Sequence, residues 1–487
     1  MKLNYRIVAK IIGFISIIVG LFMLLPALVS YISNGSDAYC FLYAGLGTIF
    51  FGSIFALVKV KKKSITKREG YLIVSLGWIT MCLVGSLPYF IHHDISLSEA
   101  IFESTSGFTT TGASIFSDIE SLSQGTLFWR SLTQWIGGMG IIVFTIAIFP
   151  LLGIGGVELF VAEAPGVQSD KFHPRIKEVA KRLWFIYVGL TVFLGIILFL
   201  FGNMNLFDSV NHALTTMSTG GFSTKNDSIA HFDSKWVQYP IILFMFVGGM
   251  NYTIIYFLFK GNFKRALKSD EWKFYIKFVL FTIITGSLLH YFLDGGTPEV
   301  VFREVTFQVI SVITTTGFIT ADYTAWHHIF TLLFFILIFV GGSGGSTSGG
   351  IKMIRHLVFF KNSILEFKRI LNPAAFLRIK VDGRTVDGKI ITRILVFLLF
   401  YLIIFILGSI AMIIILNDDP TPFLSAIGST ATCISNVGPA IGSVGPVNNF
   451  AHIPAVGKII LSFIMVVGRL EVFSVLIILT PFFWKNR

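Results

Sequence analysis

The sequence predicts an all-α polytopic membrane protein in which two N-terminal helices precede four parallel repeats. Two observations carry this prediction. First, 54% of the 487 residues are hydrophobic and only 13% are charged, which is too apolar for a water-soluble globule. Second, a short Thr/Ser-rich run that ends in glycine occurs four times, at Gly112, Gly220, Gly317 and Gly438. Similarity recurring along a chain indicates an internal repeat.

Ten segments are long and apolar enough to cross a bilayer, which requires about 20 residues per helix. They lie at roughly 7–32, 39–58, 71–91, 127–152, 183–202, 237–259, 274–293, 328–350, 392–416 and 455–482. The first is too long for the apolar region of a cleaved signal peptide and leads directly into the second. We therefore expect ten spans, the later ones long enough to tilt or break.

Basic residues fix the expected orientation. With a cytoplasmic N-terminus, 32 of the 38 Lys and Arg residues fall on the inner side. The others are Arg130, Lys225, Lys235, Arg303 and Lys458 outside, and Arg469 within a span. The positive-inside rule therefore predicts that both termini are cytoplasmic. The net charge of +12 follows from basic inner loops and does not indicate a nucleic-acid partner.

The four runs have similar surroundings, because each follows a short amphipathic segment and precedes a long apolar one. The runs are Thr109-Thr110-Thr111-Gly112, Ser218-Thr219-Gly220, Thr314-Thr315-Thr316-Gly317 and Ser435-Asn436-Val437-Gly438. Their glycines are 108, 97 and 121 residues apart. The predicted organisation is a two-helix extension at 1–69 and repeats at 70–170, 171–265, 266–380 and 381–487.

The amphipathic segments, at about 96–107, 205–217, 299–313 and 420–433, are too short to cross a bilayer. They must re-enter the membrane sheltered by protein. An even number of crossings per repeat places all four runs on the outer side, so the repeats are parallel rather than inverted. Each repeat then consists, in order, of a span, a pore helix, a filter segment and a second span. The four repeats are expected in a pseudo-fourfold arrangement around one pore. The carbonyl ends of the pore helices would favour a cation there.

Glycine suits such a filter because carbonyls that face one axis require left-handed backbone, which glycine adopts without steric cost. Converging carbonyls can replace the water shell of a monovalent cation. One Thr-Gly alone is equally typical of a turn, but four in similar units favour a filter. The predicted filter residues are Thr110, Thr111, Gly112, Ser218, Thr219, Gly220, Thr315, Thr316, Gly317, Asn436, Val437 and Gly438. The ion is expected at Thr111, Thr219, Thr316 and Val437.

Residues 341–350 contain six glycines at the inner end of a span. Each glycine costs a helix about 1 kcal/mol relative to alanine, so the helix should break there. The residues concerned are Gly341, Gly342, Ser343, Gly344, Gly345, Ser346, Thr347, Gly349 and Gly350. A break at membrane depth must be buried or line a cavity. The alternative is close helix packing through small residues.

Arg469 lies well inside the last span. A buried arginine costs at least about 2.5–3.5 kcal/mol on insertion scales, so it normally faces a cavity or a partner. Two interpretations remain: a positive charge in the pore beneath the filter, or a structural contact with a carbonyl or carboxylate. Glu471, two residues on, lies on a different helical face and is expected to pair elsewhere.

Several motifs together resemble the Trk/Ktr/HKT superfamily of potassium transporters, most closely its bacterial TrkH/TrkG group of membrane subunits. These motifs are Gly107-Phe108-Thr109-Thr110-Thr111-Gly112-Ala113, Trp135-Ile136-Gly137-Gly138-Met139-Gly140, Ser218-Thr219-Gly220-Gly221-Phe222-Ser223-Thr224, Gly341-Gly342-Ser343-Gly344-Gly345-Ser346-Thr347 and Gly468-Arg469-Leu470-Glu471. The resemblance covers essentially the whole chain. Serine at the first filter glycine is associated with sodium permeation in plant relatives, so glycine at all four positions favours potassium.

The resemblance implies potassium uptake across the bacterial inner membrane through a single-file pore, with K⁺ as the transported ion and no bound organic cofactor. It implies that the glycine-rich segment blocks the path below the filter. It further implies a homodimer seated on a cytoplasmic TrkA-type ring of nucleotide-binding subunits. The inner segments 154–182 and 352–393 are too short to form such a domain themselves. The alternative is an H⁺- or Na⁺-coupled potassium symporter, whereas the sequence has no catalytic constellation typical of an enzyme.

Overall fold

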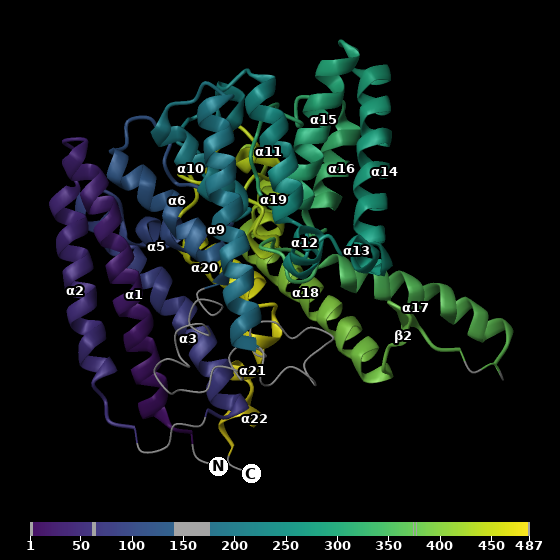
Figure 1. Cartoon of the computed structure of the whole chain (residues 1–487), viewed down its shortest axis with the longest axis horizontal. Helices are drawn as coiled ribbons and strands as arrows, with labels where there is room; N and C mark the ends of the chain where they lie inside the picture. The colour runs from purple at the N-terminus through teal and green to yellow at the C-terminus, as the bar shows by residue number, and fades with distance from the viewer. Residues whose placement is uncertain (1–2, 61–64, 141–175, 374, 376, 486–487) are drawn as a thin grey trace.

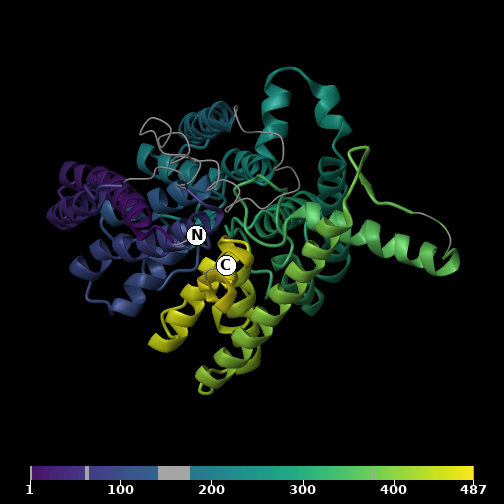
Figure 2. The same cartoon turned by 90° about the horizontal axis from the view of Figure 1, so that it is seen from below.

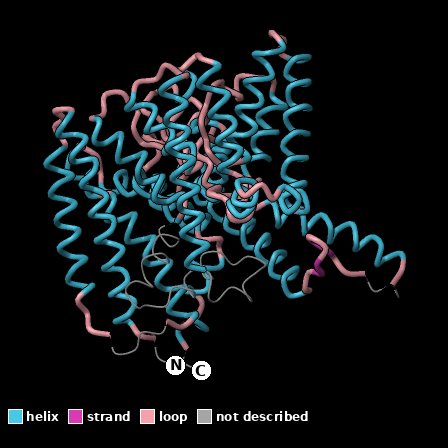
Figure 3. Tube along the Cα trace, in the orientation of Figure 1, coloured by secondary structure: helices cyan, strands magenta, loops and turns pink. Residues whose placement is uncertain are grey.

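The computed structural model describes residues 3–60, 65–140, 176–373, 375 and 377–485. These residues are almost entirely helical (Figures 1 and 3). The end of the expected span at 127–152 and most of the inner segment 154–182 lie outside the described residues.

The N-terminal extension is a pair of helices, α1 (Tyr5–Ile32) and α2 (Ala38–Ala56), that contact each other along their length. A Cβ atom on Gly13 would lie 2.6 Å from the carbonyl oxygen of Gly52, and one on Gly20 would lie 2.8 Å from that of Gly45. Such close backbone approach requires small residues, as in many membrane helix pairs.

The helices Lys67–Gly85 and Phe263–Lys268 and the hairpin at 380–385 cross the expected boundaries at 69, 265 and 380, and the other described elements fall within the predicted extension or the four predicted repeats. The first contains α3 (Lys67–Gly85), α4 (Leu87–His92), α5 (Leu97–Phe108) and α6 (Gln124–Gly138). The second contains α9 (Ile176–Leu200), α10 (Leu206–Met217), η1 (Ser228–His231), α11 (Lys235–Gly248), α12 (Tyr252–Phe259) and α13 (Phe263–Lys268). The third contains α14 (Asp270–Leu293), α15 (Pro298–Ile313), α16 (His328–Ile338), α17 (Met353–Leu371), β1 (Lys380–Val381) and β2 (Arg384–Thr385). The fourth contains α18 (Gly388–Ile415), α19 (Pro422–Ser435), η2 (Gly442–Val444), α20 (Ala455–Arg469), α21 (Phe473–Leu479) and α22 (Pro481–Trp484).

Short helices α5, α10, α15 and α19 stand within two residues of the four segments expected to re-enter the membrane. Seen from below, the repeats follow one another around the middle of the molecule (Figure 2). In each repeat the helix after the run contacts the short helix of the next repeat. These contacts are α6 with α10, α11 with α15, α16 with α19, and α20 with α5. Since the last contact returns to the first repeat, the order is cyclic.

The placement of apolar and polar side chains is the reverse of that in a water-soluble protein. The long helices α9, α14 and α18 expose large apolar side chains such as Phe193, Phe281 and Leu407. The short helices and the runs that follow them hold serines and threonines that are fully buried. Apolar side chains can face outward without cost only in lipid, so this pattern fits a membrane protein with a polar centre.

Six described helices are long and apolar enough to cross a membrane, or up to eight if each of two bent pairs counts as one span. The expected span at 237–259 is bent by 109° between α11 and α12, and the one at 455–482 is bent by 115° between α20 and α21. In the second case Glu471 and Val472 both have left-handed backbone, with φ of 56° and 57°, which an α-helix cannot accommodate. The segment expected to span at 328–350 is helical only as far as Ile338.

The described residues depart from an all-α fold at one place. β1 and β2 pair in antiparallel register, Lys380 with Thr385 and Val381 with Arg384, and form a small hairpin after α17 (Figure 3). The turn uses Asp382 and Gly383, both with positive φ, an Asp-Gly pair typical of two-residue hairpin loops.

Candidate functional site

Each short helix begins at a clear start signal. Ser96 and Glu99 form a capping box on α5, and the side chain of Asn205 accepts a hydrogen bond from the backbone of Asp208 on α10. Helices α15 and α19 instead begin with proline, at Pro298 and Pro422, where the missing N–H costs nothing. Different residues therefore produce the same event, the start of a short helix.

All four short helices end in the same way. The third residue of each run donates its N–H to the carbonyl five residues earlier, the longer bond of a Schellman cap. These bonds are Thr111 to Ser106 at 2.9 Å, Gly220 to Thr215 at 2.9 Å, Thr316 to Ser311 at 2.8 Å and Val437 to Thr432 at 3.1 Å. The second residue of each run is left-handed: Thr110, Thr219, Thr315 and Asn436, with φ between 53° and 56°. These residues are fully buried.

This geometry corrects the predicted register of the second run. The sequence predicts that Gly220 is the equivalent, in the second run, of Gly112 in the first. The glycine with the matching positive φ is instead Gly221, at 78°. By its hydrogen bond to the carbonyl five residues earlier, Gly220 is the equivalent of Thr111, Thr316 and Val437. It therefore occupies the ion-binding position that the sequence assigned to Thr219. The error arose because two glycines stand side by side, and only the backbone conformation distinguishes them. We call residues 109–112, 218–221, 314–317 and 435–438 the filter runs.

The filter runs contact one another in a closed cycle. A Cβ atom built on each final glycine would lie under 3.0 Å from a carbonyl oxygen of the following repeat. The pairs are Gly112 with Gly220, Gly221 with Thr316, Gly317 with Val437, and Gly438 with Thr111. Glycine is favoured there, because a side chain would have to displace that carbonyl and the backbone is left-handed. The cycle brings four main-chain carbonyls into one small region.

Helices outside the runs also rely on glycine. A Cβ atom on Gly137 of α6 or Gly468 of α20 would collide with the carbonyl of Phe108 or Ile434, the residue just before a filter run. A Cβ atom on Gly248 of α11 would lie 3.0 Å from Thr219 Cγ2 and 3.5 Å from the Met217 carbonyl oxygen, a close contact without a collision. The small residues after the first, second and fourth runs therefore allow these helices to approach the carbonyl ends of the short helices.

The segment that follows each filter run is hydrogen-bonded to the short helix that precedes that run. The bonds are Ile115 N to Glu103 Oε2 at 2.9 Å, Thr224 Oγ1 to Asp208 Oδ1 at 2.6 Å, Gln308 Nε2 to the Ala321 carbonyl at 2.9 Å, and Ser443 N to Ser425 Oγ at 3.0 Å. In the fourth repeat the loop residue Asp419 also accepts from Ser443 Oγ at 2.6 Å. Burial raises the pKa of Asp419, but hydrogen bonds from Ser443, Thr421 and Ser425 outweigh it and leave this pKa below its usual value.

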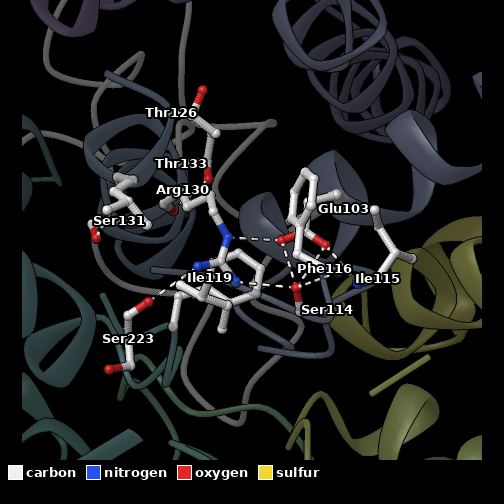
Figure 4. A network of polar contacts seen from close by, with 12 residues as sticks. Glu103, Ser114, Ile115, Phe116, Ile119, Thr126, Arg130, Ser131, Thr133 and Ser223 are labelled. Atoms are coloured by element: carbon white, nitrogen blue, oxygen red, sulfur yellow. Dashed lines mark hydrogen bonds and ion pairs between the residues drawn. The ribbon is translucent and has the colours of Figure 1, made fainter. Parts of the chain in front are cut away.

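In the first repeat, the side chain of Glu103 that accepts this hydrogen bond also forms an ion pair with Arg130 (Figure 4). Arg130 Nε lies 2.8 Å from Glu103 Oε1, and both side chains are buried. The guanidinium also donates to the carbonyl of Ser223 at 3.0 Å and to Ser114 Oγ at 3.2 Å, and lies 4.1 Å from the ring centre of Phe222. The sequence placed Arg130 on the outer side of the membrane; in the structure α6 buries its side chain within the protein, where it joins the first and second repeats.

The glycine-rich segment 341–350 lies against three of the filter runs. Thr347 Oγ1 is 3.2 Å from Thr219 Oγ1, and the N–H of Gly349 donates to Thr315 Oγ1 at 2.6 Å. A Cβ atom on Gly349 would also meet Asn436, 2.9 Å from its Cβ. The left-handed residues of the second, third and fourth runs therefore face this segment, which is non-helical, as the sequence predicted.

Other contacts fix the glycine-rich segment in place. Ser343 N donates to the Gly249 carbonyl at 2.9 Å, and Gly344 N donates to Glu271 Oε1 at 2.6 Å. The Lys352 ammonium donates to the Ser348 carbonyl. The segment is thus held by main-chain and side-chain bonds rather than by helix packing.

Arg469 contacts carbonyls rather than a carboxylate among the bonds that the structure describes. Nη1 donates to Thr347 at 2.8 Å, and Nη2 donates to Gly137 at 2.7 Å and to Gly138 at 3.1 Å. The guanidinium therefore joins the fourth repeat to the glycine-rich segment and to the first repeat. Glu471 does pair elsewhere, as expected, with Arg355 of α17.

Sequence reasoning missed Gln134, which is fully buried on α6. Its Nε2 donates to the Gly220 carbonyl at 2.6 Å, and its Oε1 accepts from Phe222 N at 3.0 Å. An available signal was a lone amide side chain three residues before Gly137, in a helix that must face the protein centre.

The chain matches the family profile of TrkH, described as a cation transport protein, over residues 41–290 and 299–485. It is 36% identical over 490 residues to the Trk system potassium uptake protein TrkH of Salmonella typhimurium, covering 99% of this chain and 100% of that protein. It is 31% identical over 491 residues to the Trk system potassium uptake protein TrkG of Escherichia coli, with 99% of each covered.

A solved structure, the crystal structure of the potassium transporter TrkH from Vibrio parahaemolyticus, matches with a TM-score of 0.88 and 32% sequence identity. The match covers 99% of this chain and 100% of that chain. Full-length agreement in sequence and in structure leads to one conclusion: the chain belongs to the TrkH family of cation transport proteins.

Proposed function

We propose that this protein takes up potassium across the bacterial inner membrane through a selective pore formed by the four filter runs. The observation that carries the proposal is the cycle in which each filter glycine accommodates a carbonyl of the next repeat. Four carbonyls that converge at the negative ends of four short helices favour a cation over an anion. The names of the relatives support potassium as that cation.

In this proposal the pore has pseudo-fourfold symmetry, with K⁺ bound at Thr111, Gly220, Thr316 and Val437. The cyclic contacts between successive repeats support a single pore formed by one chain. The filter faces outside and both termini are cytoplasmic, as the positive-inside rule predicts.

The glycine-rich segment is proposed as the gate. It touches the filter runs of three repeats, and Arg469 holds it through the Thr347 carbonyl. Because the segment lacks regular structure and is held by hydrogen bonds to several repeats, it can shift by exchanging those bonds without unfolding a helix. Opening would then require a shift of residues 341–350 away from the filter.

The force for such a shift is proposed to come from a separate cytoplasmic nucleotide-binding subunit of the TrkA type, on which the protein sits as a homodimer. Helix α17 supports this, because it follows the gate segment directly, projects from the body of the molecule (Figure 1) and contacts the fourth repeat through Arg355 and Glu471. A partner that pulls on α17 would move the gate segment.

The test is ⁸⁶Rb⁺ uptake into proteoliposomes with competing K⁺ or Na⁺, with and without an imposed H⁺ gradient. A pore predicts uptake that follows the Rb⁺ gradient alone, and competition by K⁺ but not by Na⁺. Uptake that requires an H⁺ or Na⁺ gradient would favour a symporter instead, which the parallel cyclic repeats do not support. Equal competition by K⁺ and Na⁺ would contradict a potassium filter.

A further inference from the structure

The second filter run differs from the others at its third position, where Gly220 lacks a side chain. The first and third runs carry threonine there, and that hydroxyl is hydrogen-bonded within the run. The bonds are Thr109 Oγ1 with Thr111 Oγ1 at 2.7 Å and Thr314 Oγ1 with Thr316 Oγ1 at 2.8 Å. The second run has no such bond to hold its third residue.

The side chain of Gln134 occupies the vacant position. A Cβ atom built on Gly220 would lie under 3.0 Å from Cγ, Cδ and Oε1 of Gln134. Gln134 comes from α6 of the first repeat, so a different repeat supplies the atoms that the second run lacks. Its Nε2 also lies 3.8 Å from the Cβ position of Gly112, at the junction of the first two runs.

The amide of Gln134 bridges the second run around its left-handed glycine. One end donates to the Gly220 carbonyl and the other accepts from the Phe222 N–H, so both flanks of Gly221 are held. Among the described residues, the carbonyls of Thr111, Thr316 and Val437 accept no comparable bond. The four carbonyls are therefore not equivalent, because one of them shares its oxygen with a fixed donor.

The corresponding positions in other repeats show that the amide is not needed to pack the helix. Gln134 stands three residues before Gly137, the glycine of α6 that contacts a short helix. Three residues before the corresponding glycines, the second repeat has Met245 and the fourth has Met465, and both are fully buried. Methionine has nearly the length of glutamine but cannot donate a hydrogen bond to a carbonyl.

We propose that Gln134 is a positioning residue of the filter, which fixes the Gly220 carbonyl in the ring and thereby sets the discrimination between K⁺ and Na⁺. This inference rests on the proposed function. A carbonyl released from Gln134 could turn away from the axis or move toward a smaller ion, and either change would weaken selection for K⁺.

The experiment compares Gln134→Met with Gln238→Met in proteoliposomes, by the ratio of K⁺ to Na⁺ needed to halve ⁸⁶Rb⁺ uptake. Gln238 is a matched control, because it is a buried amide on α11 that donates to the Phe232 carbonyl and accepts from Arg303, and neither partner belongs to a filter run. We expect Gln134→Met to reduce selectivity by about tenfold, as the loss of one buried hydrogen bond can, and Gln238→Met to lower thermal stability in detergent without changing selectivity.

A rescue variant makes the test specific. Gln134→Ala with Gly220→Thr places at position 220 the threonine that the first and third runs carry, and Ser218 stands where Thr109 bonds to Thr111. We expect this double variant to be more selective than Gln134→Ala alone. If Gln134→Met does not insert, Gly220→Ala gives the same measurement, since its methyl group displaces the amide.

Unchanged selectivity in Gln134→Met, or in Gly220→Ala in its place, would overturn the inference. An equal loss in Gln238→Met would overturn it as well, because any buried amide would then do the same. These results differ from failure of the proposed function itself, in which the wild-type protein would show no preference for K⁺.

Discussion

Arg469 and Thr347 are joined by a 2.8 Å hydrogen bond from the guanidinium Nη1 to the main-chain carbonyl. Thr347 in turn lies against Thr219 of the second filter run. A charged side chain of the last repeat is thus connected through the glycine-rich segment to the second filter run. Of the two interpretations of Arg469, the structural contact with carbonyls is present, whereas a positive charge in the pore stays a prediction.

Replacing Arg469 with alanine should raise flux. The substitution frees the Thr347 carbonyl and removes a charge that opposes a passing cation by about 4 kcal/mol at 4 Å with an effective dielectric of about 20. We expect at least about a tenfold increase in ⁸⁶Rb⁺ flux per inserted protein, with some loss of thermal stability from the unpaired carbonyls. Arg469→Lys keeps the charge but not the planar guanidinium, so its flux should lie between that of the wild type and that of Arg469→Ala. Lower stability without increased flux would assign Arg469 to packing alone.

Deleting residues 345–348 should increase basal flux in the absence of any cytoplasmic partner. The deletion removes Thr347 and its contacts with Thr219 and Arg469, so the obstruction can no longer be held against the filter. Ser346→Ala is the control, because among the described residues the partners of Ser346 Oγ are Ser343 and Ser348, both within the segment; this variant should behave as wild type. Were the deleted protein to insert normally with flux no higher than wild type, the segment would not be a gate.

Substituting the filter glycines by serine should raise Na⁺ permeability relative to K⁺. Gly112, Gly221 and Gly317 have φ between 78° and 83°, and a Cβ atom on any of them would displace a neighbouring carbonyl. Gly261→Ser is the matched control: its φ is 69°, but nothing lies within 4 Å of its Cβ position, so it bears similar backbone strain without touching the filter. A wild-type K⁺/Na⁺ ratio in all three filter variants would reject the filter assignment.

Removing one partner of the Glu103–Arg130 pair should be more damaging than removing both. Glu103→Leu leaves a buried guanidinium without its counter-charge, which typically costs about 3–5 kcal/mol. The double substitution Glu103→Leu with Arg130→Met leaves no buried charge and should recover part of that loss. Thermal unfolding in detergent of Glu103→Leu, of Arg130→Met and of the double variant measures the coupling. Additive losses would show that the two side chains act independently.

The sequence alone determined the membrane character of the chain, the short helices and the approximate site. Apolar composition and amphipathic patterning are local properties, so the short segments at about 96–107 and 299–313 could be located before any tertiary contact was known. The glycine content of residues 341–350 likewise predicted a break, because the cost of glycine in a helix does not depend on its neighbours.

Only the tertiary structure decided the register of the second run and the partners of the buried polar groups. Gly220 and Gly221 are identical in the sequence, and they differ only in backbone φ and in what lies against them. Gln134 and Gly220 are 86 residues apart, and no local pattern relates them. Their relation follows from the packing of α6 against α10, since a side chain fills the space that another repeat leaves open only when both helices are in place.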